Sequence, residues 1–294
     1  MLLKFTSAGR TATARLACLL LALFFCGGTA ARAAGFMVSP GRVELPVKPG
    51  FERTFPVVVD YSKDEGEAGL PNLRIAVRTE DWTLDPEGGL RTAPAGTLAR
   101  SATPWLTLST TEFVIAAGTK QVVRVTVTVP PGTPAGDYYA ALYVEDRDPP
   151  PPPKEGERRL NIRYRFYSLV YVMVPELTRR GELKKIRVAY DGRAVNVNSL
   201  LANGGNSHLR PVHSFEVRDE QDRAVARSES KETTVLLGGS ELSEGLSLKA
   251  ALPPGKYKLI YQVDFGESQP VQAGQYDFEV TTPVAEKKPA PQIR

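Results

Sequence analysis

The most constraining feature of this 294-residue sequence is a strict alternation of apolar and polar residues that ends at Val129. Valine stands at every second position from 123 to 129, with arginine or threonine between. A period of two residues puts the valines on one face of an extended chain, as in a half-buried strand and not in a helix. Residues 130–136, which are rich in proline and glycine, then end the run, because proline cannot donate a ladder hydrogen bond. The pattern predicts a β-strand over residues 119–129.

The same rhythm continues along the chain, as short apolar runs separated by glycine and proline, and no ten-residue window shows helical periodicity. We therefore predict the all-β class. In the first half the expected strands are 37–47, 53–61, 72–79, 82–84 with Leu90, 106–108, 119–129, 137–145 and 160–174. In the second half they are 183–190, 194–201, 212–217, 224–228, 233–237, 243–250, 256–265 and 272–280. Such a count predicts two immunoglobulin-like β-sandwich domains in tandem after a cleaved signal peptide.

The first 33 residues have the features of a secretory signal peptide. Basic residues at positions 4, 10 and 15 precede an apolar run over 16–26, and small residues follow up to Ala33. The run is too short to span a bilayer as a helix. We expect the mature chain to begin at Ala34 and to reside in the periplasm, with the cell surface as the alternative. The bulky Phe25 disfavours a lipoprotein that begins at Cys26.

Removal of this peptide changes the chemistry of the chain. Both cysteines, Cys18 and Cys26, lie inside it, so we expect no disulfide, cysteine nucleophile or cysteine metal site in the mature protein. It also holds four of the 37 basic residues and no acidic one, which leaves 33 basic against 33 acidic residues. A balance near zero gives no reason to expect nucleic acid as a partner. No other segment is long and apolar enough to be a transmembrane span.

The 261 residues after the signal peptide are about right for two domains. We expect the first at 34–175 and the second at 182–282, with a hinge between them and a disordered tail at 283–294. The last expected strand of the first domain, residues 160–174, follows a loop with five prolines at 149–153. It is apolar on both faces from Phe166 onward. Such a strand must be covered on both sides or offer one side to another molecule.

Four stretches of the first domain, taken in order, resemble the amino-terminal domain of the PapD-like periplasmic chaperones, which assemble pili through the chaperone and usher pathway. They are an arginine ahead of an apolar alternation, a strand that carries a tryptophan into a polar hairpin, an apolar strand that passes through a glycine turn into a strand with an arginine, and two final strands joined by a long loop. The matching residues are 38–45 with Arg42, 75–88 with Trp82, 103–125 with Gly118 and Arg124, and 137–144 with 160–175. This covers about half of the mature chain.

The resemblance implies a non-enzymatic protein that works by strand donation, in which its last strand fills a groove in a client subunit that lacks a strand of its own. It implies an exported, fimbrial-type polypeptide as client and an outer-membrane usher as a further partner. In the family, an arginine on the first strand and a lysine on the last strand bind the client's terminal carboxylate. Arg42 matches the arginine. The lysine position falls near Leu169 or Val170, and only Arg163 and Arg165 stand upstream, so the sequence departs from the pattern there.

Either face of the last strand could be the donor. One row holds Ile162, Tyr164, Phe166, Val170, Val172 and Val174, and the opposite row holds Tyr167, Leu169, Tyr171 and Met173. Alternatively both rows are buried, one by the strand's own sandwich and one by the second domain. The residues that we expect to bind a partner are Arg42, Arg163, Arg165, Ile162, Tyr164, Phe166, Val170 and Val172.

The remaining candidate chemistry is weak. His208 and His213 flank Pro211, which favours a loop or strand end over a metal pair. Ser228 and Lys231 have the spacing of a serine and lysine nucleophile pair, but the other motifs of such an active site are missing, so a polar strand edge is expected. Trp105 is expected in the core.

Trp82 fits either a core position or a glycan-binding platform. We therefore expect no enzyme, cofactor or metal. The leading hypothesis is a chaperone-like assembly factor, and the alternative is an envelope or cell-surface immunoglobulin-like module that binds glycan or protein.

Overall fold

The segments between the prolines and glycines are strands almost throughout. The computed structural model describes residues 35–61, 70–147, 165–266 and 269–281. Among these residues a single turn of 3-10 helix, Thr103–Trp105, is the only helical element. No helix in these ranges has the length and apolar character needed to cross a membrane. The predicted signal peptide and tail lie outside the described residues, as does the five-proline loop.

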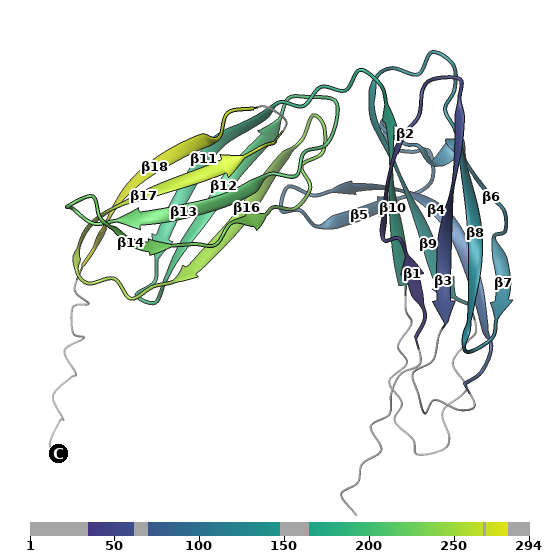
Figure 1. The fold of residues 1–294 in the computed structure, drawn as a ribbon, viewed down its shortest axis with the longest axis horizontal. Helices are drawn as coiled ribbons and strands as arrows, with labels where there is room; N and C mark the ends of the chain where they lie inside the picture. Colours follow the sequence, from purple (N-terminus) through teal and green to yellow (C-terminus); the bar gives the residue numbers. More distant parts are fainter. Residues whose placement is uncertain (1–34, 62–69, 148–164, 267–268, 282–294) are drawn as a thin grey trace, which may run out of the picture. The chain divides into compact units, whose positions relative to one another are not determined.

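The first half of the chain forms two facing sheets (Figure 1). One sheet has the order β1-β3-β8-β6 and comprises β1 (Met37–Ser39), β3 (Glu52–Tyr61), β8 (Thr119–Thr128) and β6 (Leu106–Leu108). The other has the order β2-β10-β9-β4-β5, with β7 also paired to β4, and comprises β2 (Arg42–Pro46), β10 (Arg165–Val174), β9 (Gly136–Asp146), β4 (Leu73–Leu84), β5 (Leu90–Ala93) and β7 (Glu112–Ile115). β2 lies at the edge of its sheet, beside β10.

The alternation in β8 has the predicted effect. Val123, Val125 and Val127 are fully buried and face the opposite sheet, while Arg124 on the other side of the strand is exposed. The strand pairs in antiparallel register with β3, whose Val57 is also fully buried. Burial of apolar side chains from both sheets supplies the main stabilising free energy, about 25 cal/mol per Å² of apolar surface removed from water.

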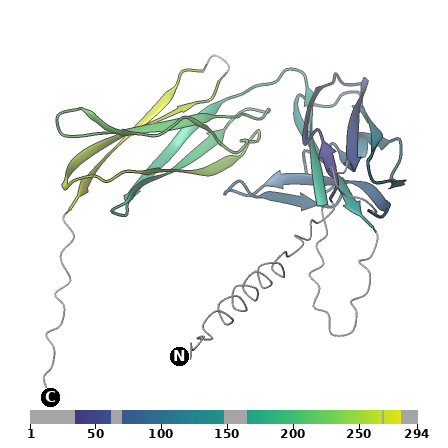
Figure 2. The ribbon, with the colours of Figure 1, turned by 60° about the horizontal axis from the view of Figure 1, so that its bottom comes forward.

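The second half forms another pair of sheets, drawn from green to yellow in Figures 1 and 2. One has the order β11-β12-β16 and comprises β11 (Gly181–Tyr190), β12 (Ala194–Asn203) and β16 (Glu241–Lys249). The other has the order β14-β13-β17-β18, with β15 paired to β13, and comprises β14 (Ala224–Arg227), β13 (Val212–Arg218), β17 (Gly255–Asp264), β18 (Gln272–Val280) and β15 (Lys231–Glu232). Phe215, Leu236, Leu259 and Tyr261 lie at the centre of its core.

The prediction of an all-β chain with two tandem immunoglobulin-like sandwiches is confirmed. The two sandwiches belong to one compact unit. Four predicted strands differ from the structure. The expected strand 37–47 is divided at Pro40 and Gly41, because β1 pairs with β3 while β2 pairs with β10 in the other sheet. The expected strands 72–79 and 82–84 are one strand, β4. Residues 233–237 form only an isolated bridge, Leu236 to Leu209.

Candidate functional site

Strand β10 pairs with two neighbouring strands over different lengths. It pairs with β9 over its whole length, from Arg165 opposite Glu145 to Val174 opposite Gly136. On its other side β2 runs parallel to it, but only opposite residues 169–173. β2 begins at Arg42, which is the register partner of Leu169. The first four residues of β10 therefore extend past the start of β2, and Arg42 marks the boundary.

The inner face of β10 belongs to the core of the first sandwich. Val170 and Val172 are fully buried, and Val174 is 1% exposed. Ser168, on the same face, is also buried and donates its hydroxyl hydrogen to the carbonyl oxygen of Pro40 (2.7 Å). The expected donor row is thus part of the hydrophobic core over this length. We correct the expectation by leaving Val170 and Val172 out of the partner surface, because a residue without exposed surface cannot meet a partner in this conformation.

Two other residues of the expected partner site, Phe166 and Arg165, have different positions. Phe166 is half-buried and packs edge-on against Phe36, with 5.1 Å between ring centroids. Arg165 is exposed and lies over the ring of Tyr143 (5.0 Å), 3.9 Å from Glu145. Ile162, Arg163 and Tyr164 lie outside the described residues, so their partner role stays a prediction.

Arg165 and Arg42 share the outer face of the sheet but do not form a pair. Arg165 precedes Leu169, the register partner of Arg42, by four residues. At about 3.3 Å per residue this puts their backbones roughly 13 Å apart along the strand. The Tyr143 hydroxyl donates to Glu145, and this bond together with Arg147 and Arg165 holds the pKa of Glu145 below its ordinary value, against the opposing effect of burial. Arg165 therefore has a carboxylate partner of its own.

The outer face of β10 is covered by an aromatic cluster that includes residues of the second sandwich. Tyr171 contacts Trp82 (5.1 Å) and Tyr139 (5.7 Å), both edge-on, an arrangement favoured by the ring quadrupoles. Val235 and Leu237 complete the cluster from the second sandwich. We call these five residues, with Ala141, the junction cluster. It explains why residues 233–237 leave the strand pattern, since two of their side chains pack here.

Trp82 is 1% exposed in this cluster, which decides between the two sequence interpretations in favour of a core position. A buried indole has no free face on which a sugar ring could stack. Trp105, which was expected in the core, is half-buried and packs against Tyr138 at 4.6 Å, so it lies at the rim of the core.

A charged group lies on the same outer face, next to Tyr171. One carboxylate oxygen, Oε1 of Glu44 on β2, is 3.0 Å from Nη2 of Arg210, 3.3 Å from Nε of Arg42 and 3.4 Å from Nε2 of His208. We call these four residues the Glu44 cluster. Arg42 and Glu44 come from the first sandwich, whereas His208 and Arg210 come from the segment between β12 and β13. The cluster therefore brings together positions more than 160 residues apart in the sequence.

The pKa of Glu44 reflects this arrangement. Partial burial alone would raise it, but the hydrogen bond from Arg210 and the charges of His208, Arg210 and Arg42 outweigh that effect and hold the pKa below its ordinary value. Glu44 is therefore a carboxylate at neutral pH and a strong hydrogen-bond acceptor.

His208 is fixed from its other side by Asp137 at the start of β9. The buried Asp137 carboxylate accepts hydrogen bonds from the backbone N–H of His208 (2.7 Å) and the hydroxyl of Ser207 (3.1 Å), and the ring Nδ1 of His208 lies 2.6 Å from it. Gly136 permits this approach. Its φ is +130°, and a Cβ there would lie only 2.9 Å from the carbonyl oxygen of Asn206.

Of the residues in and around the Glu44 cluster, the sequence predicted a binding role only for Arg42. It gave no indication that Glu44, Arg210, His208 and Asp137 lie close together. The only local signal was the polarity of the segment around Pro211, which suggested a loop. The sequence lacks the lysine that the resemblance implies on the last strand, and a basic residue from the second sandwich, Arg210, lies near Arg42 through the shared Glu44. No local pattern in the sequence connects residues 42 and 210.

The other weak candidates have structural roles. Nδ1 of His213 lies 2.7 Å from the hydroxyl of Tyr261 inside the second core. Ser228 is buried and accepts a hydrogen bond from the backbone N–H of Phe215 (2.9 Å). Across the described ranges no group of histidine, cysteine, aspartate and glutamate is arranged to hold a metal ion.

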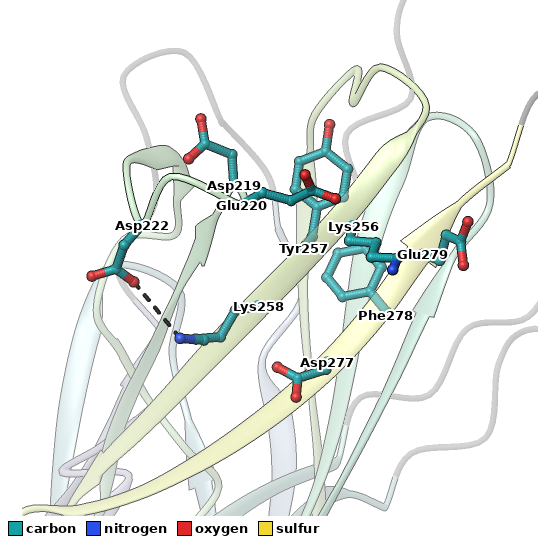
Figure 3. Close-up of a pocket in the computed structure, with 9 residues that line it drawn as sticks. All are labelled: Asp219, Glu220, Asp222, Lys256, Tyr257, Lys258, Asp277, Phe278 and Glu279. Atoms are coloured by element: carbon teal, nitrogen blue, oxygen red, sulfur yellow. Dashed lines mark ion pairs between the residues drawn. The ribbon is translucent and has the colours of Figure 1, made fainter.

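A hollow at one end of the second sandwich is one place where a small ligand could bind (Figure 3). The turn after β13 and the paired strands β17 and β18 line it. Its aromatic residues, Tyr257 and Phe278, stack on each other at 5.6 Å and pack toward the core, and Lys258 is 3.8 Å from Asp222. The hollow is a charged surface depression whose two aromatic rings also pack against the core of the second sandwich.

Comparison with known proteins gives structural similarities only. No family model and no curated protein matches the sequence. Among solved structures, the chain is similar to a chaperone in a chaperone–tip adhesin complex of CFA/I fimbriae biogenesis, with 12% identity, a TM-score of 0.45 and coverage of 82% of this chain and 98% of that chain. It is also similar to the class 5 fimbriae chaperone CfaA, with 13% identity, a TM-score of 0.43 and coverage of 83% and 98%.

A third similar structure comes from the chaperone–tip adhesion subunit complex CsuC–CsuE of the archaic Csu pili of Acinetobacter baumannii. The identity is 13%, the TM-score 0.45 and the coverage 82% of this chain and 98% of that chain. All three are structures of fimbrial chaperones or their complexes, the class of protein that the sequence resembles. At these identities the similarity concerns the fold and assigns no role to any residue of this chain.

Proposed function

We propose that this protein is a non-enzymatic, periplasmic chaperone-like factor that binds exported polypeptides, with fimbrial-type subunits as the client class. The client's strand adds to the first sandwich beside β10, ahead of the start of β2, and the client's terminal carboxylate binds at Arg42. An outer-membrane usher is a further expected partner. The observation that carries the proposal is the position of Arg42, where β2 begins to pair with β10.

The geometry supports an edge-on mode of binding. Both faces of β10 are already used over residues 169–174, the inner face in the core and the outer face in the junction cluster. An extended client can therefore form hydrogen bonds with the backbone of β10 and a charged contact with Arg42, where β2 begins. Added strands gain affinity from main-chain hydrogen bonds, and pockets or charges at defined positions give specificity. A charge-assisted contact from Arg42 to a carboxylate would contribute about 1.5–3 kcal/mol.

The function is tested by Arg42→Ala. About half of the Arg42 side chain is exposed and its ion pair is with the partly exposed Glu44, so its loss should lower the free energy of unfolding by less than about 1 kcal/mol. Recovery of exported polypeptides with the tagged protein, quantified by mass spectrometry, should fall about tenfold or more. Arg124→Ala, an exposed arginine on the other sheet, is the matched control and should leave recovery unchanged.

Equal recovery with the Arg42 and Arg124 variants would contradict the proposal. A loss of recovery that accompanies an equal loss of folding would show that Arg42 is structural. Binding that depends on loops of the second sandwich instead would favour the surface-module alternative.

A further inference from the structure

Three basic side chains converge on one oxygen atom of the chain's own Glu44. Arg210, Arg42 and His208 all lie within 3.4 Å of Oε1. Such a convergence resembles the way proteins bind the carboxylate of a ligand, since arginine presents several N–H donors in a planar fork. Here the carboxylate is supplied from within the chain.

Two of these basic groups are held in place by contacts that do not involve Glu44. The guanidinium of Arg210 lies over the ring of the buried Tyr171, 5.6 Å from its centroid. His208 is fixed by Asp137 through its backbone N–H and its ring, and it packs against Tyr171 at 4.7 Å. The donors therefore keep their positions when Glu44 is absent, and such a preorganised set needs little rearrangement to bind another carboxylate.

Glu44 itself is held less firmly than Arg210 and His208. It belongs to β2, a five-residue strand at the edge of the sheet, and its side chain is 35% exposed, against 22% for Arg210 and 5% for His208. A rotation of its side chain would take the carboxylate into solvent, where water replaces the lost contacts. The cluster combines two fixed donors, Arg210 and His208, with a removable acceptor.

We infer that Arg42, Arg210 and His208 form a carboxylate-binding site that Glu44 occupies as an internal ligand, and that the terminal carboxylate of a bound polypeptide takes its place. The part that concerns the polypeptide rests on the proposed function. A chain that adds beside β10 ahead of β2 cannot continue past Arg42, because β2 already pairs with residues 169–173. An added chain that runs parallel to β10 presents its carboxyl end to the cluster, and not an acidic side chain of its interior.

Acetate is the probe that tests the site without any client. Glu44→Ala leaves the three basic groups without their shared acceptor, so Tm should fall by about 2–4 °C, the shift typical of a small loss of stability in a chain of this size. Acetate should restore this loss in a saturable way, whereas acetamide or chloride at matched ionic strength should not. The wild-type protein, whose site is filled, should gain nothing from acetate beyond the ionic-strength effect. The double variant Glu44→Ala, Arg210→Gln should show no rescue.

A second variant covers the case in which Glu44→Ala folds poorly. Glu44→Gln keeps the volume of the side chain, and acetate should alter the emission of Trp82, which contacts Tyr171, in a Trp105→Phe background. If acetate acts on neither Glu44 variant beyond its effect on the wild-type protein, the site as inferred does not exist.

A separate experiment tests whether a client polypeptide uses the site. If Glu44 competes with a client carboxylate, Glu44→Gln should increase recovery of exported polypeptides several-fold, and Arg210→Gln should decrease it. Acetate rescue with unchanged recovery in both variants would leave the carboxylate site standing and overturn its use by a client. Loss of recovery in Arg42→Ala together with failed acetate rescue would leave the proposed function standing and overturn the inference.

Discussion

The two faces of β10 pack against different parts of the molecule, although both are apolar in sequence. The inner face holds Val170 and Val172, which are fully buried among the strands of their own sandwich. The outer face holds Tyr171, whose ring contacts other aromatic rings and a cation and belongs to a cluster with two apolar residues of the second sandwich. The apolar residues of this strand are therefore explained by burial on both faces, each against a different part of the molecule. A partner can then contact only the backbone edge of the strand and the charged residues near the start of β2.

The largest expected effect comes from a charge on the inner face. Val170→Asp buries a carboxylate without a partner in the core, which costs several kcal/mol, so the variant should unfold or express insolubly. Soluble yield and the denaturant midpoint measure it. Arg165→Asp, on the exposed beginning of the same strand, is the control and should fold normally. A soluble Val170→Asp protein of wild-type stability would show that the inner face is not core.

An intermediate effect is expected where the outer face meets the second sandwich. Leu237 is 5% exposed in the junction cluster, and Leu237→Ala should remove about 2–4 kcal/mol of packing between the sandwiches. Because this cluster joins apolar residues of both sandwiches, calorimetry should show one unfolding transition become two. Val225→Ala, at an exposed position on β14, should leave the calorimetric trace unchanged. A single, merely shifted transition in Leu237→Ala would argue against the junction cluster as the coupling element.

The smallest expected effect is a pH-dependent change in stability that comes from Glu44 on the outer face. The folded-state pKa of Glu44 lies below its ordinary value of 4.5, so between these two values the unfolded chain binds more protons. The stability that Glu44 contributes is present above pH 4.5 and is lost as the pH falls through the folded-state pKa. Given its exposure we expect about 0.5–1 kcal/mol. Denaturant midpoints of wild type and Glu44→Gln should converge below this window and differ above it.

A variant of the inner face gives the contrast. Val172→Ala should lower the stability by the same amount at every pH, because it removes packing and no titrating group. If the difference between wild type and Glu44→Gln does not depend on pH, Glu44 does not contribute through its charge.

Much of the fold could be predicted from periodicity. The alternation in β8 and the punctuation by proline and glycine give strand positions because a half-buried strand must alternate and proline must end a ladder. The strand predicted at 233–237 was wrong, since Val235 and Leu237 pack into the junction cluster and only Leu236 turns into the second core. An apolar run of five residues cannot show which of two cores each side chain enters.

The site could be predicted only in part. Arg42 follows from its place ahead of an apolar alternation, but two of the residues expected to bind a partner, Val170 and Val172, are fully buried. Arg42 lies opposite Leu169 and so belongs to the outer face, whereas Val170 and Val172 belong to the inner one. Arg210 and His208 meet Glu44 through packing of one sandwich against the other, and no local pattern encodes such a contact.

The central claim is that an exported polypeptide adds its terminal strand beside β10 and ends at Arg42. Site-specific photocrosslinking in the periplasm tests it most directly, with benzoylphenylalanine at position 167 on β10 and, as the control, at position 225 on β14. The account predicts crosslinks from position 167 to the carboxyl-terminal peptide of an exported chain, several-fold weaker in an Arg42→Ala background, and none from position 225. Crosslinks of equal strength at both positions, or to interior peptides regardless of Arg42, would contradict it.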